Sequence, residues 1–307
     1  MFTSQVNQLI TDLGLSVLSY ADDTQLYITV GSEKLNQSEA LVRLQKAAEL
    51  VRNWYVCNGL QLNSDKSEVM LFGSPKSLSS ADLQTVQLLG TGLSTNHETI
   101  RSLGVLRDAQ LSFSAQTHAV TKSCFFFIHK LWQLRRYIDK TMALTLGLAL
   151  VQSRLDYCNS LYHNAKKLDI DKLQNVQKAL ARFVFGVHSK QHSSQLLRSL
   201  HILPMHSRIQ YKLLTLTRRA VVENTPLYLS NEISLTSANT HRCLRSSDSG
   251  KLTLPRVNTN AGKTSFHFSA PSLWNSLPSS IRDPSLSYTT FKNRLKTHLF
   301  SAAYPDN

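Results

Sequence analysis

Residues 15–30 read LSVLSYADDTQLYITV, and this stretch decides how the first part of the chain folds. Two apolar runs, rich in β-branched and aromatic residues, flank the acidic pair Asp22 and Asp23. Strand-forming runs on both sides of a short polar break are typical of a β-hairpin. We therefore predict a hairpin that carries adjacent carboxylates at its turn.

An acidic pair at a turn has two interpretations. Most such turns are simply solvated. Alternatively, the pair binds Mg²⁺, which prefers hard oxygen ligands and usually takes only one or two protein carboxylates. A cation would also relieve the repulsion between two neighbouring negative charges. Because phosphoryl-transfer polymerases work with two such ions, Asp22 and Asp23 are candidate catalytic residues and metal ligands.

The residues after this hairpin have helical periodicity over positions 36–57. Apolar side chains recur there at intervals of three and four: Leu41, Leu44, Ala48, Val51 and Tyr55. Asn36 and Glu39 have the spacing of a capping box, in which each side chain binds the other residue's backbone N–H. We predict an amphipathic helix that begins near Asn36.

Short strands are expected after the helix. Residues 58–73, NGLQLNSDKSEVMLFG, contain two apolar runs and favour a second hairpin that turns around residues 63–66. Residues 74–83 show no periodicity and are predicted to be a loop. Further strand candidates lie near residues 86–89 and 100–106.

From about residue 115 the apolar spacing becomes helical. The stripes comprise Val120, Cys124, Phe127, Leu131 and Leu134, then Leu173, Val176, Leu180 and Phe183, then Ile209, Leu213, Leu216 and Ala220, and finally Phe291, Leu295 and Leu299. Asp139 suits the N-cap of a helix over 142–155, which is apolar on most sides and expected to be central. Gly186 and Pro204 fit a helix end and a helix start.

These patterns predict an α+β chain with three parts. Residues 1–113 combine strands with one helix, residues 114–228 are helical, and residues 229–307 form an extension that is partly irregular and ends in a helix. The sequence has no run of about 18 apolar residues, so we expect no membrane span. It has no CxxC pair among its four cysteines, which we expect to be reduced and mostly buried.

The charge of the chain changes along its length. Residues 1–100 hold 6 Lys and Arg against 10 Asp and Glu, whereas residues 101–307 hold 28 against 10. A long basic region favours a polyanionic partner, most often nucleic acid. The candidate phosphate contacts are Arg135 and Arg136 at a helix end, and Lys166, Lys167, Lys172, Lys178 and Arg182 on the polar side of the third helix.

Aromatic and histidine residues in the basic region add further hypotheses. Trp132 stands among cations, an arrangement suited to stacking on single-stranded bases, although Phe125, Phe127 and Leu131 fit a core stripe. His188, His192, His201 and His206, with Cys158 or Cys243, could also form a zinc site, but no cysteine lies at zinc-knuckle spacing beside them. Surface histidines are the favoured interpretation.

An ordered set of motifs resembles one family, the reverse transcriptases of non-LTR (LINE-type) retrotransposons. Residues 20–27, YADDTQLY, resemble the central palm hairpin, residues 58–63 with Lys66 resemble the next palm motif, and residues 103–113 resemble the primer-grip hairpin. Residues 153–159 (SRLDYCN), 200–204, 244–247 and 270–278 resemble the thumb and C-terminal regions. The order and spacing match over nearly the whole chain.

The resemblance implies a fold, a reaction and partners. It implies a reverse-transcriptase palm followed by a helical thumb, and RNA-directed DNA synthesis with Mg²⁺ on an RNA template and a DNA primer or target. Asp22 would be a principal metal ligand, Asp23 its neighbour, and Lys66 would lie near the phosphates of the incoming nucleotide. The family further implies an intracellular location, in the nucleus or in a cytoplasmic ribonucleoprotein.

The sequence also departs from the family pattern. The family palm needs another Asp well upstream of the Tyr-Ala-Asp-Asp turn, and a fingers subdomain. Asp12 is the only acidic residue before the turn, and its position suits a connection rather than a ligand. We therefore expect these residues alone to be an inactive polymerase fragment. A stand-alone basic nucleic-acid-binding module and a decayed, non-functional reading frame remain alternatives.

Overall fold

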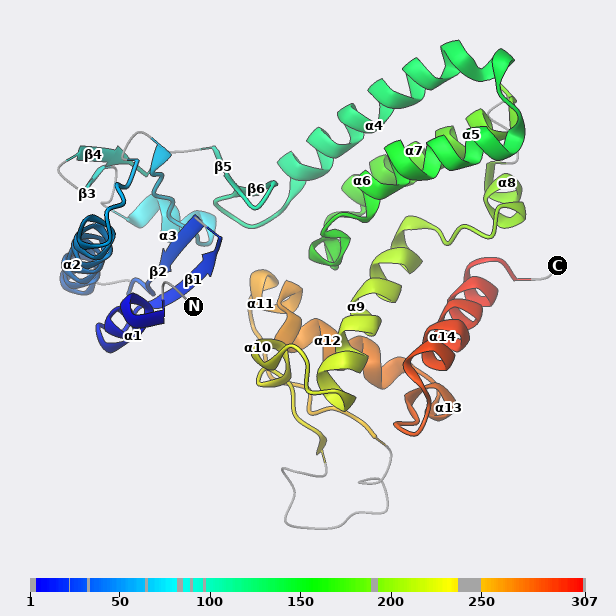
Figure 1. Cartoon of the computed structure of the whole chain (residues 1–307). Helices are drawn as coiled ribbons and strands as arrows, with labels where there is room; N and C mark the ends of the chain where they lie inside the picture. The colour runs from blue at the N-terminus through cyan, green and yellow to red at the C-terminus, as the bar shows by residue number, and fades with distance from the viewer. Residues whose placement is uncertain are drawn as a thin grey trace. The chain divides into compact units, whose positions relative to one another are not determined.

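The computed structural model describes residues 4–21, 23–31, 34–63, 66–81, 85–88, 91–95, 98–188, 193–236 and 250–305. It divides into two compact units, Met1–Leu111 and Ser112–Asn307, which run from blue to cyan and from green to red in Figure 1. Helices and antiparallel hairpins both occur in the described residues, so the fold class is α+β. Residues 229–307 belong to the second unit in this division.

The first unit alternates short helices with hairpins. Its elements are α1 (Ser4–Asp12), β1 (Ser16–Tyr20), β2 (Asp23–Tyr27), α2 (Lys34–Cys57), α3 (Pro75–Ser80), β3 (Thr85–Leu88), β4 (Thr91–Ser94), β5 (Thr99–Ser102) and β6 (Val105–Asp108). Strands β1 and β2, β3 and β4, and β5 and β6 pair as three separate antiparallel hairpins within the described residues. The predicted strand at 100–106 is therefore a tight hairpin, with Ser102 opposite Val105.

A small apolar core holds α1 and α2 behind the first hairpin. Val6 and Ile10 of α1 and Ala47 and Val51 of α2 are buried, and the partly buried Val17 of β1 packs against them. Burying apolar side chains stabilises the unit by about 25 cal/mol for each Å² removed from water. The amphipathic helix predicted from residue spacing is thus the helix that supports the hairpin.

Three local predictions in this unit are wrong. Residues 58–63 and 66–73 form no strand, because Leu62 and Val69 pack against the α1–α2 and α2–β3 clusters from an irregular backbone. Residues 75–80 form a helix, since the side chain of Ser74 caps it by accepting from the Ser77 N–H. Asn36 lies inside α2, which begins at Lys34, and not at an N-cap.

The second unit is helical in all its described residues apart from connections and one isolated β-bridge. Its elements are α4 (Ser114–Leu134), η2 (Arg135–Tyr137), α5 (Lys140–Gly147), η3 (Leu148–Gln152), α6 (Ser153–Asp156), η4 (Asn159–Tyr162), α7 (Lys167–Phe185), α8 (Ser193–Ser199), α9 (Met205–Val222), α10 (Leu227–Ser230), α11 (Asn260–Thr264), α12 (Phe266–Ser276), α13 (Ser279–Arg282) and α14 (Tyr288–Ala303).

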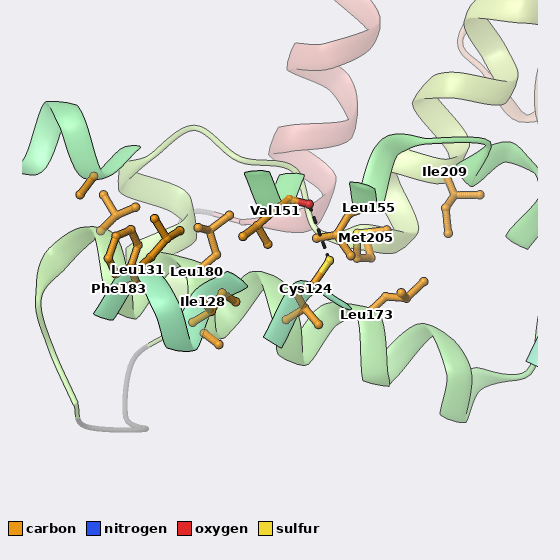
Figure 2. Close-up of a cluster of buried hydrophobic side chains, with 14 of the residues drawn as sticks. Cys124, Ile128, Leu131, Val151, Leu155, Leu173, Leu180, Phe183, Met205 and Ile209 are labelled. Atoms are coloured by element: carbon orange, nitrogen blue, oxygen red, sulfur yellow. Dashed lines mark hydrogen bonds between the residues drawn. The ribbon is translucent and has the colours of Figure 1, made fainter. Parts of the chain in front are cut away.

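The main core lies between α4, the α5–η3–α6 segment and α7 (Figure 2). Leu131 of α4, Leu180 of α7 and Val151 of η3 are almost completely buried. The η3 segment is a π-helix, whose wider turn changes the usual carbonyl pairing. The Cys124 thiol donates to the Val151 carbonyl at 3.8 Å, as the dashed line in Figure 2 shows.

Helix ends in this core follow the predicted caps. Asp139 accepts a hydrogen bond from the Met142 N–H at 2.7 Å, which confirms it as the N-cap of α5. Gly186 ends α7 with a φ of 68°, a left-handed conformation that glycine adopts without steric cost. Met142 and Leu148 are exposed, however, so α5 and η3 are less central than their apolar sequence suggested.

A second core joins α9 to the C-terminal helices. Trp274, Phe291 and Leu295 are buried there with Leu214 of α9. The Trp274 indole donates to the Gly250 carbonyl at 2.9 Å, so both its ring and its polar atom are satisfied. The described C-terminal residues around Trp274 and Phe291 are therefore well packed, and they include α11, α12 and α13 in addition to the predicted terminal helix.

Candidate catalytic turn and nucleic-acid interface

The acidic turn joins β1 to β2 by two residues. Tyr20 pairs with Asp23, and Ala21 lies in the connection between them. Asp22 lies outside the described residues. Tyr20 is 66% exposed, and the Asp23 side chain is also exposed. The Asp23 carboxylate is therefore open to solvent and to a ligand.

The backbone of this turn is strained. Ala21 has a φ of 53°, in the left-handed region that costs a non-glycine residue roughly 1–2 kcal/mol. Two-residue hairpin turns require positive φ, because their twist must match that of the strands. A hairpin that keeps alanine at such a position is held by the contacts of its strands.

Side-chain hydrogen bonds anchor β2 to the rest of the first unit. The hydroxyls of Thr24 and Tyr55 of α2 lie 3.2 Å apart. The Gln25 amide donates to the Ser102 hydroxyl at 2.6 Å. The hairpin that resembles the palm motif thereby contacts α2 and the hairpin that resembles the primer grip.

A second contact joins the same two hairpins. Arg107 of β6 donates to the Tyr27 hydroxyl at 3.2 Å, and that hydroxyl donates to Gln25. These partners are about 80 residues apart in sequence, so the contact fixes the relative placement of two separate motifs. Neither Gln25 nor Arg107 was identified from sequence, since no local pattern marks a side chain that bridges two hairpins.

The other two candidates near the turn are not joined to it within the described residues. Lys66 is exposed, and its backbone N–H donates to the Asn63 carbonyl at 3.3 Å. Among the described side chains, no hydrogen bond or ion pair connects Lys66 with Asp23. Asp12 ends α1 and accepts from the Gln8 amide at 3.0 Å, so it lies in the helix and not in the connection before β1.

The described residues do not gather a complete metal site. No group of three or more His, Cys, Asp or Glu side chains that could hold a metal occurs in the part of the chain that the structure describes. Asp23 offers one accessible carboxylate, which fits one position in a Mg²⁺ shell but not the ligands of a two-metal centre. The described residues therefore do not form a two-metal centre by themselves.

The histidines considered for zinc serve separate contacts. His188 stacks on Trp132, with ring centroids 4.4 Å apart, and His201 stacks on Phe300 at 5.8 Å. His206 forms a hydrogen bond with Gln210 at 3.1 Å. His192 and Cys243 lie outside the described residues.

Arg135 caps a helix. Its guanidinium donates to the carbonyls of Phe183 (2.8 Å) and Val184 (3.1 Å) at the end of α7, and to that of Ile138 (2.9 Å). Two of these carbonyls belong to the last turn of α7, where carbonyls lack the usual intrahelical partner and need another donor. Arg135 is thus a poor phosphate contact, and the structure assigns it an architectural role in place of the one predicted.

The remaining basic candidates differ in solvent exposure and in the side-chain contacts that they make. Arg136, Lys166 and Lys167 are exposed. Lys172 pairs with the buried Asp169 at 2.8 Å, and Arg182 donates to Ser193 at 3.1 Å.

Lys178 lies half-buried on α7. The exposed Arg136, Lys166 and Lys167 can offer their charge to a polyanion. Lys172 and Arg182 also stabilise the fold through their contacts with Asp169 and Ser193.

Cations and aromatic rings meet often in this unit. Four pairs lie between residues 126 and 185: Lys130 with Phe126, Arg136 with Tyr137, Lys140 with Phe185, and Arg154 with Phe127. The cation lies 4.0–5.9 Å from the ring centroid in these pairs, within the range of about 6 Å over which a ring face attracts a cation. Trp132, in contrast, is half-buried against Phe183.

Exposure of the aromatic residues also differs from the sequence prediction. Phe125 is 41% exposed and Phe126 is 57% exposed, although Phe125 was assigned to the core stripe. Three consecutive phenylalanines cannot all face one side of a helix, because successive residues are about 100° apart. The 100° spacing of successive residues therefore predicts that at least one of the three rings is exposed.

Comparison with known proteins gives no assignment: no family model, no curated protein and no solved structure matches the chain. No helix in the described ranges has both the length and the apolar character that crossing a membrane requires.

Proposed function

We propose that the chain is part of a non-LTR retrotransposon reverse transcriptase, with a partial palm in the first unit and a thumb in the second. In this proposal Asp22 and Asp23 contribute carboxylates to a Mg²⁺ site. The helical unit binds the RNA template and the DNA primer or target. The family implies work in the nucleus or in a cytoplasmic ribonucleoprotein.

One observation carries the proposal. The two hairpins that resemble the palm motif and the primer grip are joined by Gln25–Ser102 and Tyr27–Arg107 hydrogen bonds. A polymerase must hold the primer end close to its catalytic carboxylates, because reacting atoms have to meet within about 3–3.5 Å. Contact between these hairpins is what such a site requires.

The open edge of β1 supports a further element of the proposal. Strand β1 pairs with β2 alone in the described residues, and Leu18 on it is 46% exposed. A two-stranded hairpin is marginal by itself, and an unpaired strand edge can accept another strand. We propose that a segment with a further carboxylate pairs here and completes the metal site.

A second candidate function is nucleic-acid binding without polymerisation. The four cation–aromatic pairs of residues 126–185 favour it independently of the acidic turn. Aromatic faces beside positive charge bind single-stranded nucleic acid with little dependence on sequence. This activity would persist in a chain that cannot polymerise.

A primer-extension assay tests the completeness of the site. The purified chain is given an RNA template, a DNA primer, nucleotides and Mg²⁺, with Asp22→Ala as control. We expect no extension from either protein, because the described residues supply no third ligand. Extension that disappears in Asp22→Ala would show that the site is complete without another segment.

Metal binding at the turn can be tested directly. Mn²⁺ is used as a paramagnetic probe, and broadening of backbone NMR signals is followed across the first unit. We expect weak binding that broadens signals around residues 20–25 and is lost in Asp22→Asn with Asp23→Asn. Broadening spread evenly, or unchanged in the double variant, would remove the catalytic assignment of this turn.

A further inference from the structure

Four side chains form a continuous row across α4 and α6. The Lys130 ammonium lies 5.9 Å from the centroid of the Phe126 ring. Phe126 meets Phe127 edge to face at 5.5 Å, and the Arg154 guanidinium lies 4.1 Å from the Phe127 ring. We call this row the cation–aromatic ladder.

The ladder is held in place by the fold. Phe127 packs against the main core, and Arg154 donates to the Leu150 carbonyl at 3.0 Å in the π-helical segment. Phe126 and Lys130 are exposed beside them. The inner half of the ladder is therefore fixed by packing, while its outer half is available to a ligand.

The outer face of α4 extends the ladder with matching chemistry. His118, Lys122, Phe125 and His129 are all exposed on this helix. The sequence of α4 contains no Asp or Glu. An exposed face with aromatic rings, cations and no carboxylate complements a polyanion that also has flat apolar surfaces.

We propose that the outer face of α4, with the ladder at its centre, binds single-stranded RNA by stacking unpaired bases on Phe126 and Phe125. Lys122 and Lys130 contact the phosphates on either side. They are eight residues apart, or about 12 Å along the helix axis. That distance is roughly three to four stacked nucleotides at about 3.4 Å each.

Single-stranded RNA fits this face better than a duplex or an acidic protein. In a duplex, bases are already stacked and paired, so exposed rings gain no partner. An acidic protein would use the cations but not the flat rings. His118 and His129 are exposed on the same helix, and we expect their ring nitrogens to hydrogen-bond the 2′-hydroxyl, the group that distinguishes RNA from DNA.

Fluorescence anisotropy tests the proposal by measuring how the whole chain binds a labelled single-stranded RNA. An RNA of about 12 nucleotides lies within the usual range of site sizes. Loss of one stacked base weakens binding by roughly 5- to 150-fold, which we expect for Phe126→Ala. Phe126→Leu should lose affinity similarly, whereas Phe126→Trp should retain it. This pattern separates stacking from simple apolar contact.

Charge is tested separately through the salt dependence of binding. Lys130→Ala should weaken binding and reduce the slope of log affinity against log salt by about 0.7, the value for one phosphate contact on a single strand. Tyr228→Ala and Lys296→Ala are matched controls, since both residues are exposed on other helices of the same unit. Both controls should bind like the wild type.

Competing occupants give distinct results. Tighter binding of single-stranded RNA than of single-stranded DNA or duplex RNA supports the proposal. Equal loss in the controls, or wild-type affinity in Phe126→Ala and Lys130→Ala, would overturn it. Concentration-dependent dimerisation that Phe126→Ala abolishes, without RNA binding, would assign the face to a protein contact.

This inference rests on the proposed function only in its choice of RNA. If the ladder variants lose RNA binding but the acidic turn takes no metal, the polymerase assignment fails and the RNA face remains. If RNA binds but is insensitive to the ladder, only the location proposed here fails.

Discussion

Two adjacent arginines show that sequence alone does not tell which side chain caps a helix and which stays exposed. Arg135 and Arg136 follow the same helix and looked equivalent as phosphate contacts. In the structure the Arg135 guanidinium bonds three carbonyls, whereas Arg136 is exposed and lies over the Tyr137 ring at 4.6 Å. Which of two neighbours turns inward depends on where the end of α7 lies, and no local pattern records that.

The arginine pair gives a prediction with an internal control. Arg135→Ala should lower the free energy of unfolding by roughly 1.5–3 kcal/mol, since carbonyls at the end of α7 lose a charged donor. Arg136→Ala should leave stability within about 0.5 kcal/mol of the wild type. Denaturant titration measures both, and equal effects of the two changes would contradict the capping role of Arg135.

Gly147 is a second residue whose role the sequence did not reveal, and that role is steric. A Cβ at this position would lie 2.5 Å from Cδ1 of Leu180, a side chain that is 1% exposed. Gly147→Ala should therefore destabilise the helical unit by up to about 2 kcal/mol, because overpacking of the buried Leu180 exceeds the roughly 1 kcal/mol that alanine gains over glycine in a helix.

Gly73→Ala is the comparison for Gly147→Ala. Its Cβ would meet its nearest neighbour at 3.4 Å, an ordinary contact. Chemical denaturation of each variant gives the two values. A neutral Gly147→Ala would mean that α5 and α7 are less closely packed than described.

At the scale of elements, the spacing of apolar residues predicted the helices that pack through one face. The helices α2, α4, α7, α9 and α14 occur where apolar stripes predicted them. All stripe residues of α7 and α14 are buried, but Leu134 of the α4 stripe is 49% exposed, and the buried Ile128 and Leu214 lie outside the stripes.

The strand prediction for residues 58–73 was wrong because the alternating Leu62 and Val69 pack from irregular backbone in the described residues 58–63 and 66–73. The short α3 was missed because its signal lies in one capping serine and a proline rather than in a period.

The connection between η4 and α7 should respond to pH. Burial, with His206 nearby, lowers the pKa of His163 from 6.5 to about 4. The unfolded chain therefore takes up a proton that the folded chain resists between these values. Stability contributed by neutral His163 is complete above about pH 6.5 and declines as the pH falls toward 4.

Urea titrations between pH 4 and pH 7 measure this effect. His163→Gln should flatten the decline in unfolding free energy over that window, because its side chain does not titrate. His129→Gln, at an exposed position of α4, should keep the wild-type slope. A His163→Gln curve that parallels the wild type would show that burial of this imidazole does not govern the pH response.

At the scale of the whole molecule, the sequence predicted an α+β chain but not the contacts that make a site. The change from acidic to basic composition predicted which part of the chain would bind a polyanion, and the motifs predicted a functional role for the acidic turn. The Tyr27–Arg107 contact and the Lys130–Phe126–Phe127–Arg154 ladder join residues from separate elements. Such contacts depend on tertiary packing, which residue spacing alone does not determine.

The central claim is that the β1–β2 turn is the catalytic turn of a reverse transcriptase that needs another carboxylate. The most direct measurement is Mg²⁺-dependent primer extension by a chimera. It joins the fingers and first palm strand of an active non-LTR reverse transcriptase to the start of this chain. We predict RNA-templated extension that Asp22→Ala abolishes and that Lys296→Ala leaves unchanged. A folded chimera that binds template and primer but extends nothing, or that is equally active with Asp22→Ala, would contradict the claim.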